Sequence, residues 1–316
     1  MTIYNFGSIN VDYVYAVESI VRPGETISAI GLQTFPGGKG ANQTVAMCRA
    51  GAKVIHAGQV GKDTEWMKGL LANEGADVSN VMVSDDVPGG CAIIQVEKSG
   101  QNSIIVLGGT NQCIPETLVE EVLSNASQGE WVTLQNEINL TPLAMKAAKA
   151  HGLKVCFNPS PLTDAIATYP LDCVDLLVVN EDEAAALAGL PNGASPEDAA
   201  ASIFATYCTT MICITLGSKG AMLFQDGGNP IRQDAFKVKA VDTTGAGDTF
   251  TGYLIAGIAQ GLGLNKVLRR AALAASISVG RNGAIPSIPC ADEVATSNGT
   301  DGTDGTNGTE AISPSH

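Results

Sequence analysis

The sequence predicts an α/β fold, in which a mostly parallel central sheet is covered by helices on both faces and carries a small antiparallel β lid. Three observations predict it. Short β-branched runs alternate with Ala-rich helical stretches along most of the chain. These runs are continuously apolar, which is typical of strands buried on both faces. Two regions, residues 26–35 and 91–107, have strand patterns that no helical stretch interrupts.

The main sheet is expected to take its strands from the apolar runs, with helices between them. The strand candidates, in chain order, are residues 3–6, 131–134, 155–157, 176–179 and 211–215. Helical patterns lie at residues 143–151 and 198–208. An alternation of this kind indicates parallel strands joined by helical crossovers.

The lid is expected from about residues 12–35 and 88–108. Residues 91–97 and 103–107 flank a turn-rich connector, Lys98-Ser99-Gly100-Gln101-Asn102, and this pattern indicates a β-hairpin. A small sheet that projects from the main body has exposed edges, which a ligand or a second subunit must cover.

The chain is expected to form one domain over residues 1–290, followed by a tail over residues 291–316. From residue 296 onward the sequence is a Gly-Thr-Asp/Asn repeat with almost no apolar residue. Such a segment cannot bury enough surface to offset its ordering entropy, so we expect the tail to be disordered.

The composition excludes several classes of function. Among the 316 residues, 18 Lys and Arg stand against 32 Asp and Glu, which gives a net charge of −14. The surface of so acidic a chain is expected to attract neither nucleic acid nor anionic membranes. No apolar run reaches the ~18–20 residues of a membrane helix. The N-terminus lacks the basic start and apolar stretch of a secretory signal, so we expect a cytoplasmic protein.

The eight cysteines are scattered singly, without a CxxC pair, and the chain has only three histidines. This pattern does not favour a Cys or His metal cluster. Several cysteines lie in apolar runs, among them Cys156 and Cys213. We interpret them as small buried side chains in a reducing compartment.

A glycine-rich turn at residues 37–43, GGKGANQ, precedes a helix-compatible stretch. Glycines let the backbone approach a ligand closely, and Lys39 and Asn42 would lie at a helix N-terminus, where N–H groups point outward. The segment is no Walker A loop, because Gly rather than Ser or Thr follows Lys39. Taken alone, it is either a ligand-binding turn or an ordinary strand-to-helix turn.

A second glycine-rich segment spans residues 241–250, VDTTGAGDTF, and apolar residues then recur at helical spacing. Gly245, Ala246 and Gly247 would form a tight loop whose N–H groups can face an oxyanion. The carboxylate of Asp248 beside them would be placed to take a proton from an attacking hydroxyl. The alternative is that Asp248 only caps the helix.

Polar residues also follow other predicted strands, at the sheet edge where open α/β folds bind ligands. Asn180 and Glu183 are three residues apart and would either orient a hydrated Mg²⁺ or form a helix capping box. Residues 217–220, GSKG, are either a plain hairpin turn or a cover for the phosphates of a nucleotide.

The first predicted strand leads into GSINVD, in which Asn10 and Asp12 alternate onto one side of an extended chain. Two polar groups in this position suit sugar hydroxyls. Glu137 follows another predicted strand and is either a sugar contact or a solvated loop acid. The missing G-x-G-x-x-G motif disfavours a dinucleotide enzyme.

Together these segments resemble the ribokinase family of carbohydrate kinases, from residue 3 to about residue 289. GGKGAN and DTTGAGDTF look like the two signature sequences of the family, and they occur in the same order, about 200 residues apart. GSINVD, RPGET, NEDE, TLGSKG and SVGRNGAIPS also fall where the family has similar sequences.

The resemblance implies a mostly parallel ribokinase-like fold and phosphoryl transfer from ATP to the 5-hydroxyl of D-ribose. Asp248 resembles the catalytic base, and Gly245, Ala246 and Gly247 resemble an anion hole for the transferring group. The implied ribose contacts are Asn10, Asp12, Gly38, Lys39, Asn42, Glu137 and Asp248. The implied nucleotide contacts are Asn180, Thr215, Gly217, Ser218, Gly220 and Gly247, with Glu183 helping to place Mg²⁺.

The resemblance also implies an activating K⁺ beside the anion hole. The residues that match this cation site, several through backbone carbonyls, are Asp242, Thr244, Ser278, Arg281, Gly283 and Ser287. Ala272 aligns with an adenine-side position that often carries a larger polar residue, and Lys219 falls where the family is variable. A homodimer that interlocks through the β lids is expected from the same resemblance.

Two alternatives remain open at this point. One is another sugar kinase of the family, such as a deoxyribokinase or a fructokinase. Asn10 favours a sugar with a 2-hydroxyl, because a site built to bond a hydroxyl rejects its deoxy analogue. The other is a non-catalytic sugar-binding regulator on the same fold. The presence of Asp248, its neighbouring glycines and Asn180 argues against that second alternative.

Overall fold

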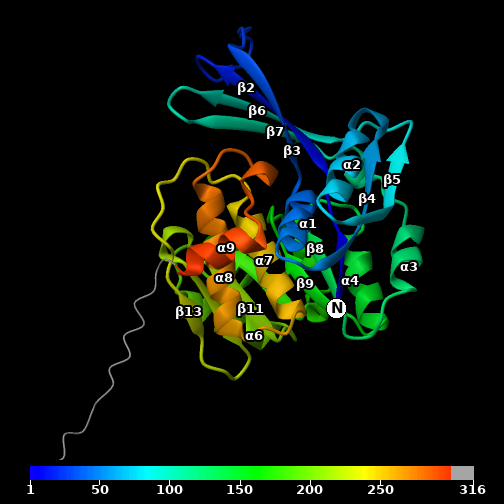
Figure 1. Cartoon of the computed structure of the whole chain (residues 1–316), viewed down its shortest axis with the longest axis vertical. Helices are drawn as coiled ribbons and strands as arrows, with labels where there is room; N and C mark the ends of the chain where they lie inside the picture. Colours follow the sequence, from blue (N-terminus) through cyan, green and yellow to red (C-terminus); the bar gives the residue numbers. More distant parts are fainter. Residues whose placement is uncertain (300–316) are drawn as a thin grey trace, which may run out of the picture.

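The computed structural model describes residues 1–299, and in this range two sheets of very different size share the chain. A large sheet lies between two layers of helices, and a small four-stranded sheet projects from one end of it (Figure 1). The predicted α/β class with a small β lid is confirmed.

Nine strands of the described residues form the large sheet. Their spatial order is β13 (Ile231–Gln233), β12 (Ala221–Gln225), β11 (Met211–Thr215), β10 (Leu176–Asn180), β9 (Lys154–Asn158), β8 (Trp131–Gln135), β1 (Thr2–Phe6), β4 (Lys53–Gly61) and β5 (Asp77–Ser84). The pairings from β11 to β5 are parallel, whereas β12 and β13 continue the sheet antiparallel. The five predicted strands correspond to β1, β8, β9, β10 and β11.

Helices cover both faces of the large sheet. Their bounds are α1 (Lys39–Arg49), α2 (Trp66–Asn73), α3 (Thr117–Leu123), α4 (Thr141–Ala150), α5 (Glu181–Leu187), α6 (Pro196–Thr206), α7 (Ala246–Ala259), α8 (Leu264–Val279) and α9 (Ala291–Gly299). Short 3₁₀ turns are η1 (Lys62–Thr64), η2 (Gly109–Gln112), η3 (Asp164–Thr168), η4 (Leu171–Cys173), η5 (Gly217–Lys219) and η6 (Ile285–Ser287).

The alternation of side chains along the buried strands divides the core into two clusters. Ile3 of β1 packs into a cluster with α1, α2, α7 and α8. Tyr4 and Phe6 of the same strand face the opposite cluster, which includes α3, α4 and α6. The continuous apolar runs in the sequence therefore reflect strands buried on both faces.

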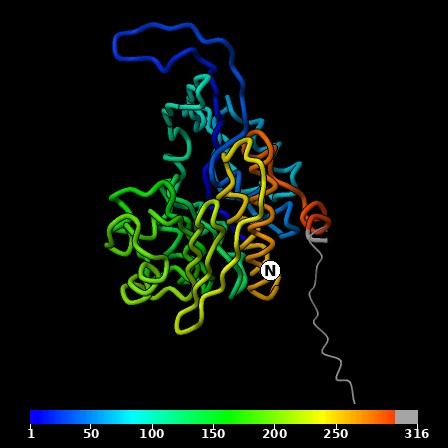
Figure 2. Tube along the Cα trace, turned by 90° about the vertical axis from the view of Figure 1, so that its left-hand side faces the viewer, coloured from blue at the N-terminus to red at the C-terminus, as the bar shows by residue number. Residues whose placement is uncertain are grey.

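The small sheet has the order β3 (Gly31–Gly37), β2 (Asn10–Val17), β6 (Gly90–Glu97) and β7 (Asn102–Leu107). The predicted hairpin is β6 and β7, which pair antiparallel, as β2 and β3 do; the central pair, β2 and β6, runs parallel. Figure 2 shows the blue segment that joins β2 to β3 extending well away from the body.

The predicted strand at residues 26–35 is too long at its start. β3 begins at Gly31, which pairs with Ala16, one residue before β2 ends. Residues 26–30 therefore lie beyond the last paired position, where the Ile30 N–H still donates to Ala16 O at 2.8 Å. Strand propensity in the sequence does not reveal where the partner strand ends.

The tail begins later than expected, because residues 291–299 form helix α9. Val294 is 1% exposed and belongs to the core, and the Glu293 carboxylate accepts the Cys290 N–H at 2.8 Å. One buried apolar contact and a satisfied helix start are enough to order this segment. The expectation of disorder for residues 300–316 concerns a part of the chain that lies outside the described residues.

Among residues 1–299, every helix is too short or too polar to span a bilayer.

Candidate active site

The predicted site residues gather at the carboxyl ends of the parallel strands and at the N-termini of α1 and α7. Asn180 and Thr215 are the last residues of β10 and β11. Lys39 is the first residue of α1, and Ala246 is the first residue of α7. The topology thus brings together segments that are about 200 residues apart in the chain.

Asp248 lies in the first turn of α7 but does not cap it. The N-cap is Gly245, in a left-handed conformation with φ of 72° that favours glycine, and no side chain caps this helix. The Asp248 carboxylate faces α1 instead: Asn42 Nδ2 donates to its Oδ2 at 2.9 Å, and Gln43 Nε2 donates to its Oδ1 at 3.0 Å. The capping interpretation of Asp248 is wrong.

Gly252 permits the close packing of α7 on α1. A Cβ at this position would overlap the Ala46 side chain and crowd the backbone of Gln43 and Met47. Because Gly252 lies one helical turn after Asp248, the close approach carries the Asp248 carboxylate to within hydrogen-bond distance of Asn42 and Gln43.

The loop before α7 offers backbone N–H groups to an anion. The Ala246 N–H makes a turn hydrogen bond of 3.2 Å to Thr243 O. The N–H groups of Gly245 and Gly247 have no partner within residues 1–299. Two unpaired donors at a helix N-terminus form a positive site, although the whole chain is acidic.

Four carboxylates act on the ammonium group of Lys39. Asp248 is the largest influence that raises the pKa of Lys39, and Glu137, Glu183 and Asp12 act in the same direction against the effect of burial. Burial raises the pKa of Asp12 to about 6, with a further contribution from the nearby Glu137. Burial also raises the pKa of Glu137, which Lys39 opposes.

Glu137 is bonded to the GSINVD segment and to the glycine-rich turn at residues 37–43. Its Oε2 accepts the Ser8 hydroxyl at 2.5 Å and the Lys39 backbone N–H at 3.0 Å. It is therefore not a solvated loop acid. Lys39 follows Gly38, the N-cap of α1, so Glu137 fixes this turn beside the start of β2.

Two asparagines face the same region with oriented amides. Asn111 Nδ2 donates to Asn10 Oδ1 at 2.7 Å, which leaves the Asn10 amide nitrogen as the group free to donate. Asn42 is 6% exposed, and its Oδ1 is buried without a hydrogen-bond partner among the described residues. A buried acceptor of this kind is costly unless a ligand or water satisfies it.

Two cavities meet at the start of α7. The larger, of about 490 Å³, is lined by the predicted nucleotide contacts Thr215, Gly217, Ser218, Gly220, Gly247 and Ala272. The smaller, of about 280 Å³, is lined by Lys39, Asn180, Glu183, Gly245, Gly247 and Asp248, among others. Thr215, Thr243 and Gly247 line both, so an elongated ligand in the larger cavity would end at Asp248.

Asn180 and Glu183 form a capping box at the start of α5. Asn180 Oδ1 accepts the Glu183 N–H at 2.8 Å, and Glu183 Oε2 accepts the Asn180 N–H at 2.9 Å. Among residues 1–299, Glu183 Oε1 and Asn180 Nδ2 make no hydrogen bond, and both residues line the smaller cavity. Lys219 lies on the surface and pairs with Glu181 at 3.2 Å.

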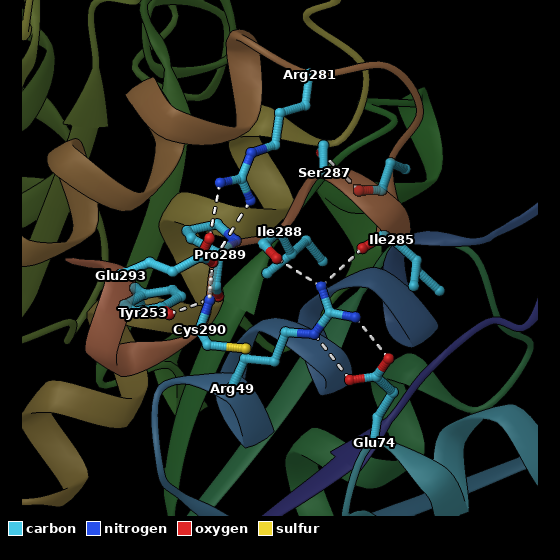
Figure 3. Close-up of polar contacts among 11 residues, drawn as sticks. Arg49, Glu74, Tyr253, Arg281, Ile285, Ser287, Ile288, Pro289, Cys290 and Glu293 are labelled. Atoms are coloured by element: carbon cyan, nitrogen blue, oxygen red, sulfur yellow. Dashed lines mark hydrogen bonds and ion pairs between the residues drawn. The ribbon is translucent and has the colours of Figure 1, made fainter.

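The residues of the expected cation site lie together on two neighbouring segments. Asp242 Oδ1 accepts the Thr244 N–H at 2.9 Å, and Asp242 Oδ2 accepts the Gly283 N–H at 2.9 Å. The side chains of Arg281 and Ser287 are bonded elsewhere: Arg281 Nη2 donates to the Glu293 carboxylate, and Ser287 Oγ donates to the Ala284 carbonyl (Figure 3). Ser278 Oγ donates to Ala275 O.

The donors expected at this site are the Asp242 carboxylate and backbone carbonyls. Within residues 1–299 no cluster of three or more Cys, His, Asp or Glu side chains could hold a metal. Oxygen donors with a single formal charge fit a hard cation of low charge such as K⁺, and do not suit a soft transition metal.

The structure adds site residues that the sequence analysis missed, chiefly Gln43, Asn111 and Asn158. Gln43 stands inside the recognised glycine-rich segment, so its position next to Asn42 was a usable signal. Asn111 and Asn158 carry no such signal, because neither lies in a motif. The apolar wall of the larger cavity, including Phe236 and Val238, comes from a segment without helix or strand.

Comparison with known proteins agrees with this geometry. Residues 2–291 match the family model of the pfkB family carbohydrate kinases. The chain is 37% identical to a ribokinase of Haemophilus influenzae over 298 residues, which are 92% of this chain and 96% of that protein. It is 38% identical to a ribokinase of Schizosaccharomyces pombe over 306 residues, with 91% and 95% covered.

Solved structures of ribokinases are also similar to this chain. The structure of Arabidopsis thaliana ribokinase complexed with ribose and ATP superposes with a TM-score of 0.83 at 33% identity, and the match covers 93% of this chain and 97% of that one.

Proposed function

The chain belongs to the pfkB family of carbohydrate kinases, and we infer that it transfers the γ-phosphoryl group of ATP to the 5-hydroxyl of D-ribose, giving ribose 5-phosphate and ADP. The observation that carries this inference is the junction of the two cavities at Gly247, where the Asp248 carboxylate faces the end of the nucleotide path. Full-length similarity to ribokinases supports the same substrate.

Asp248 is proposed as the catalytic base. Its carboxylate is 6% exposed and is held by Asn42 and Gln43, so it is oriented before the sugar binds. It would accept the proton of the 5-hydroxyl as that oxygen attacks the γ-phosphorus and the bond to the leaving ADP oxygen breaks. A positioned base typically contributes ~10²–10⁴ in rate.

Gly245, Ala246 and Gly247 are proposed to stabilise the transferring group. Phosphoryl transfer depends mainly on alignment and charge neutralisation. The unpaired N–H groups of Gly245 and Gly247 supply donors at the helix N-terminus, which stabilise negative charge as it develops.

Ribose recognition is proposed to rest on acceptors and donors of known orientation. Asp12, Glu137 and the orphaned Asn42 Oδ1 would accept sugar hydroxyls, while Asn10 and Lys39 would donate, with Gly38 beside them. Because Asn10 Oδ1 accepts from Asn111, the Asn10 amide nitrogen is the group left to donate, and a 2-hydroxyl would accept from it. A deoxyribose would leave it unsatisfied.

The nucleotide is proposed to bind in the larger cavity along Thr215, Gly217, Ser218, Gly220 and Ala272. Mg²⁺, when bound, would neutralise charge on the phosphates. Asn180 and the unpaired Glu183 Oε1 fit a hydrated Mg²⁺, which needs few direct protein ligands. K⁺, when bound, would be held by Asp242, Thr244, Ser278, Arg281, Gly283 and Ser287, several of them through backbone carbonyls, beside the anion-binding loop.

We also propose a cytoplasmic homodimer joined through the small sheets. All eight cysteines, which lie within the described chain, are free thiols, as a reducing compartment requires. Exposed apolar side chains lie along the small sheet and need a cover.

The test is a coupled ADP-release assay with ribose, deoxyribose and fructose, each with and without K⁺. We expect the highest kcat/KM for ribose. Asp248→Asn should lose at least ~10²-fold in turnover and still bind ATP. Asp182→Asn is the matched control, because it removes an exposed acid in the first turn of α5. Near-normal turnover by Asp248→Asn would refute the role of the base, and a preference for another sugar would refute the substrate.

A further inference from the structure

We propose that Gln43 is a positioning residue for Asp248, and that a chain of buried amides fixes the direction in which the Gln43 amide faces. The proposal rests on the function inferred above, in which Asp248 is the base. Gln43 and Gln135 are each 1% exposed, so their amide groups depend on partners inside the protein. Both polar atoms of the Gln43 amide and the Gln135 Nε2 have such partners, whereas Gln135 Oε1 has none among the described residues.

The chain of amides runs from the core to the carboxylate. Asn5 Oδ1 accepts from Gln135 Nε2 at 3.1 Å, and the same nitrogen donates to Gln43 Oε1 at 2.8 Å. Gln43 Nε2 then donates to Asp248 Oδ1 at 3.0 Å and to Asn158 Oδ1 at 3.3 Å. Side chains of β1, β8 and α1 are thus linked by hydrogen bonds to Asp248 in the first turn of α7.

Backbone carbonyls set the direction of this chain at both ends. Asn5 Nδ2 donates to Gly40 O at 2.8 Å, and Asn158 Nδ2 donates to Val178 O at 2.9 Å. A backbone carbonyl can only accept, so each asparagine must turn its Nδ2 to the carbonyl and its Oδ1 inward. Both ends therefore offer acceptors to the glutamines between them.

The Gln43 amide has only one satisfactory orientation as a result. If it were reversed, its Oε1 would face Asp248 Oδ1 and Asn158 Oδ1, and three acceptors would meet without a proton. In the observed sense it gives Asp248 an N–H donor on one oxygen while Asn42 supplies one on the other. A carboxylate held on both oxygens keeps one orientation, and charge-assisted hydrogen bonds of this kind are strong.

The test compares three variants of the full chain by the pH dependence of kcat and by KM. Gln43→Met keeps an unbranched side chain of similar length and removes the donor. We expect kcat to fall by about 10- to 100-fold, as for a slightly misplaced catalytic group, with the KM for ATP changed less than about twofold. The acid limb of the kcat profile should move to higher pH, because a carboxylate that loses an N–H donor binds a proton more readily.

Gln135→Met tests the chain of amides at a residue one step further from Asp248. This variant also keeps the proposal testable if Gln43→Met does not fold. Gln135→Met should lower kcat and move the acid limb to higher pH by less than Gln43→Met does, because Asn158 still accepts from Gln43. Thr133→Val is the control: Thr133 is also buried and donates to Asn5 Oδ1 at 2.8 Å, but it lies off the path to Asp248. It should lower stability and leave the pH profile unchanged.

A crystal structure of Gln43→Met separates failure of this proposal from failure of the proposed function. We expect Asp248 to adopt a second rotamer or to lose its contact with Asn42, whatever substrate the wild type uses. An unchanged Asp248 together with wild-type kcat and pH profile would overturn the positioning role. A wild type that does not phosphorylate ribose would overturn the function, and the structure of the variant would still decide the positioning role.

Discussion

At the scale of single residues, the candidate site balances four acids against one lysine. Asp12, Glu137, Glu183 and Asp248 all act on Lys39, and the pKa of Lys39 is raised as a result. Sugar binding is expected to need ionised acids, because carboxylates accept hydroxyl hydrogen bonds better than carboxylic acids do. Burial raises the pKa of Asp12 to about 6, so the charge of this side chain changes close to neutral pH.

The resulting prediction is a pH dependence in ribose recognition. As pH falls through about 6, Asp12 becomes protonated and loses an acceptor, so kcat/KM for ribose should fall while the KM for ATP stays nearly constant. Initial rates between pH 5 and 8 measure this. Asp12→Asn should have a low kcat/KM that no longer changes near pH 6. A wild-type kcat/KM that is flat between pH 5 and 7 would contradict the prediction.

At the scale of elements, helix α1 joins the site to the segment that carries the expected cation residues. Its first turn supplies Lys39 and Asn42, and its last residue, Arg49, donates to the carbonyls of Ile285 at 3.1 Å and Ile288 at 2.5 Å (Figure 3). The Arg49 guanidinium also meets the Glu74 carboxylate through Nε and Nη2. One arginine therefore ties η6 to the end of α2 across the C-terminus of α1.

We expect Arg49→Met to destabilise the fold. The change leaves two backbone carbonyls and the Glu74 side chain, 24% exposed, without their donor, which should cost about 2–4 kcal/mol. Thermal and urea unfolding measure it. The control is Lys62→Met, which breaks the Lys62–Glu65 pair at side-chain exposures of 67% and 50%, where an ion pair contributes little. Equal losses in the two variants would contradict the role of Arg49 in stability.

Local signals in the sequence predicted the elements better than the contacts between them. The apolar runs of β8 to β11 and the capping pair of Asn180 and Glu183 are local patterns, and they form as expected. The hydrogen bond from Gln43 to Asp248 joins residues 205 positions apart, and no local pattern encodes it. Its cause is the packing of α1 on α7, which depends on the absence of a side chain at Gly252.

At the scale of the whole molecule, the small sheet remains incompletely covered. The strand register places Leu32, Ile93, Ile105 and Leu107 on the face opposite Asp12, and each is at least 41% exposed. Ile104 and Val106, 52% and 64% exposed, lie on the Asp12 face, so both faces of this projecting sheet expose apolar side chains, which is a cost for a monomer. Asp12 lies on the same sheet, so contacts that order the sheet would also order part of the proposed ribose site.

Ile105→Lys should therefore affect both assembly and ribose recognition. We expect the wild type to sediment at twice the chain mass of 32.4 kDa, and the variant at the chain mass, because a buried lysine opposes the contact between two lids. The KM for ribose should rise in the variant more than the KM for ATP, whose cavity lies in the main body. Leu143→Lys, an exposed apolar position on α4, is the control and should change neither. A wild type that sediments at the chain mass at micromolar concentration would contradict the dimer. A dimeric Ile105→Lys would instead exclude this face of the small sheet as the interface.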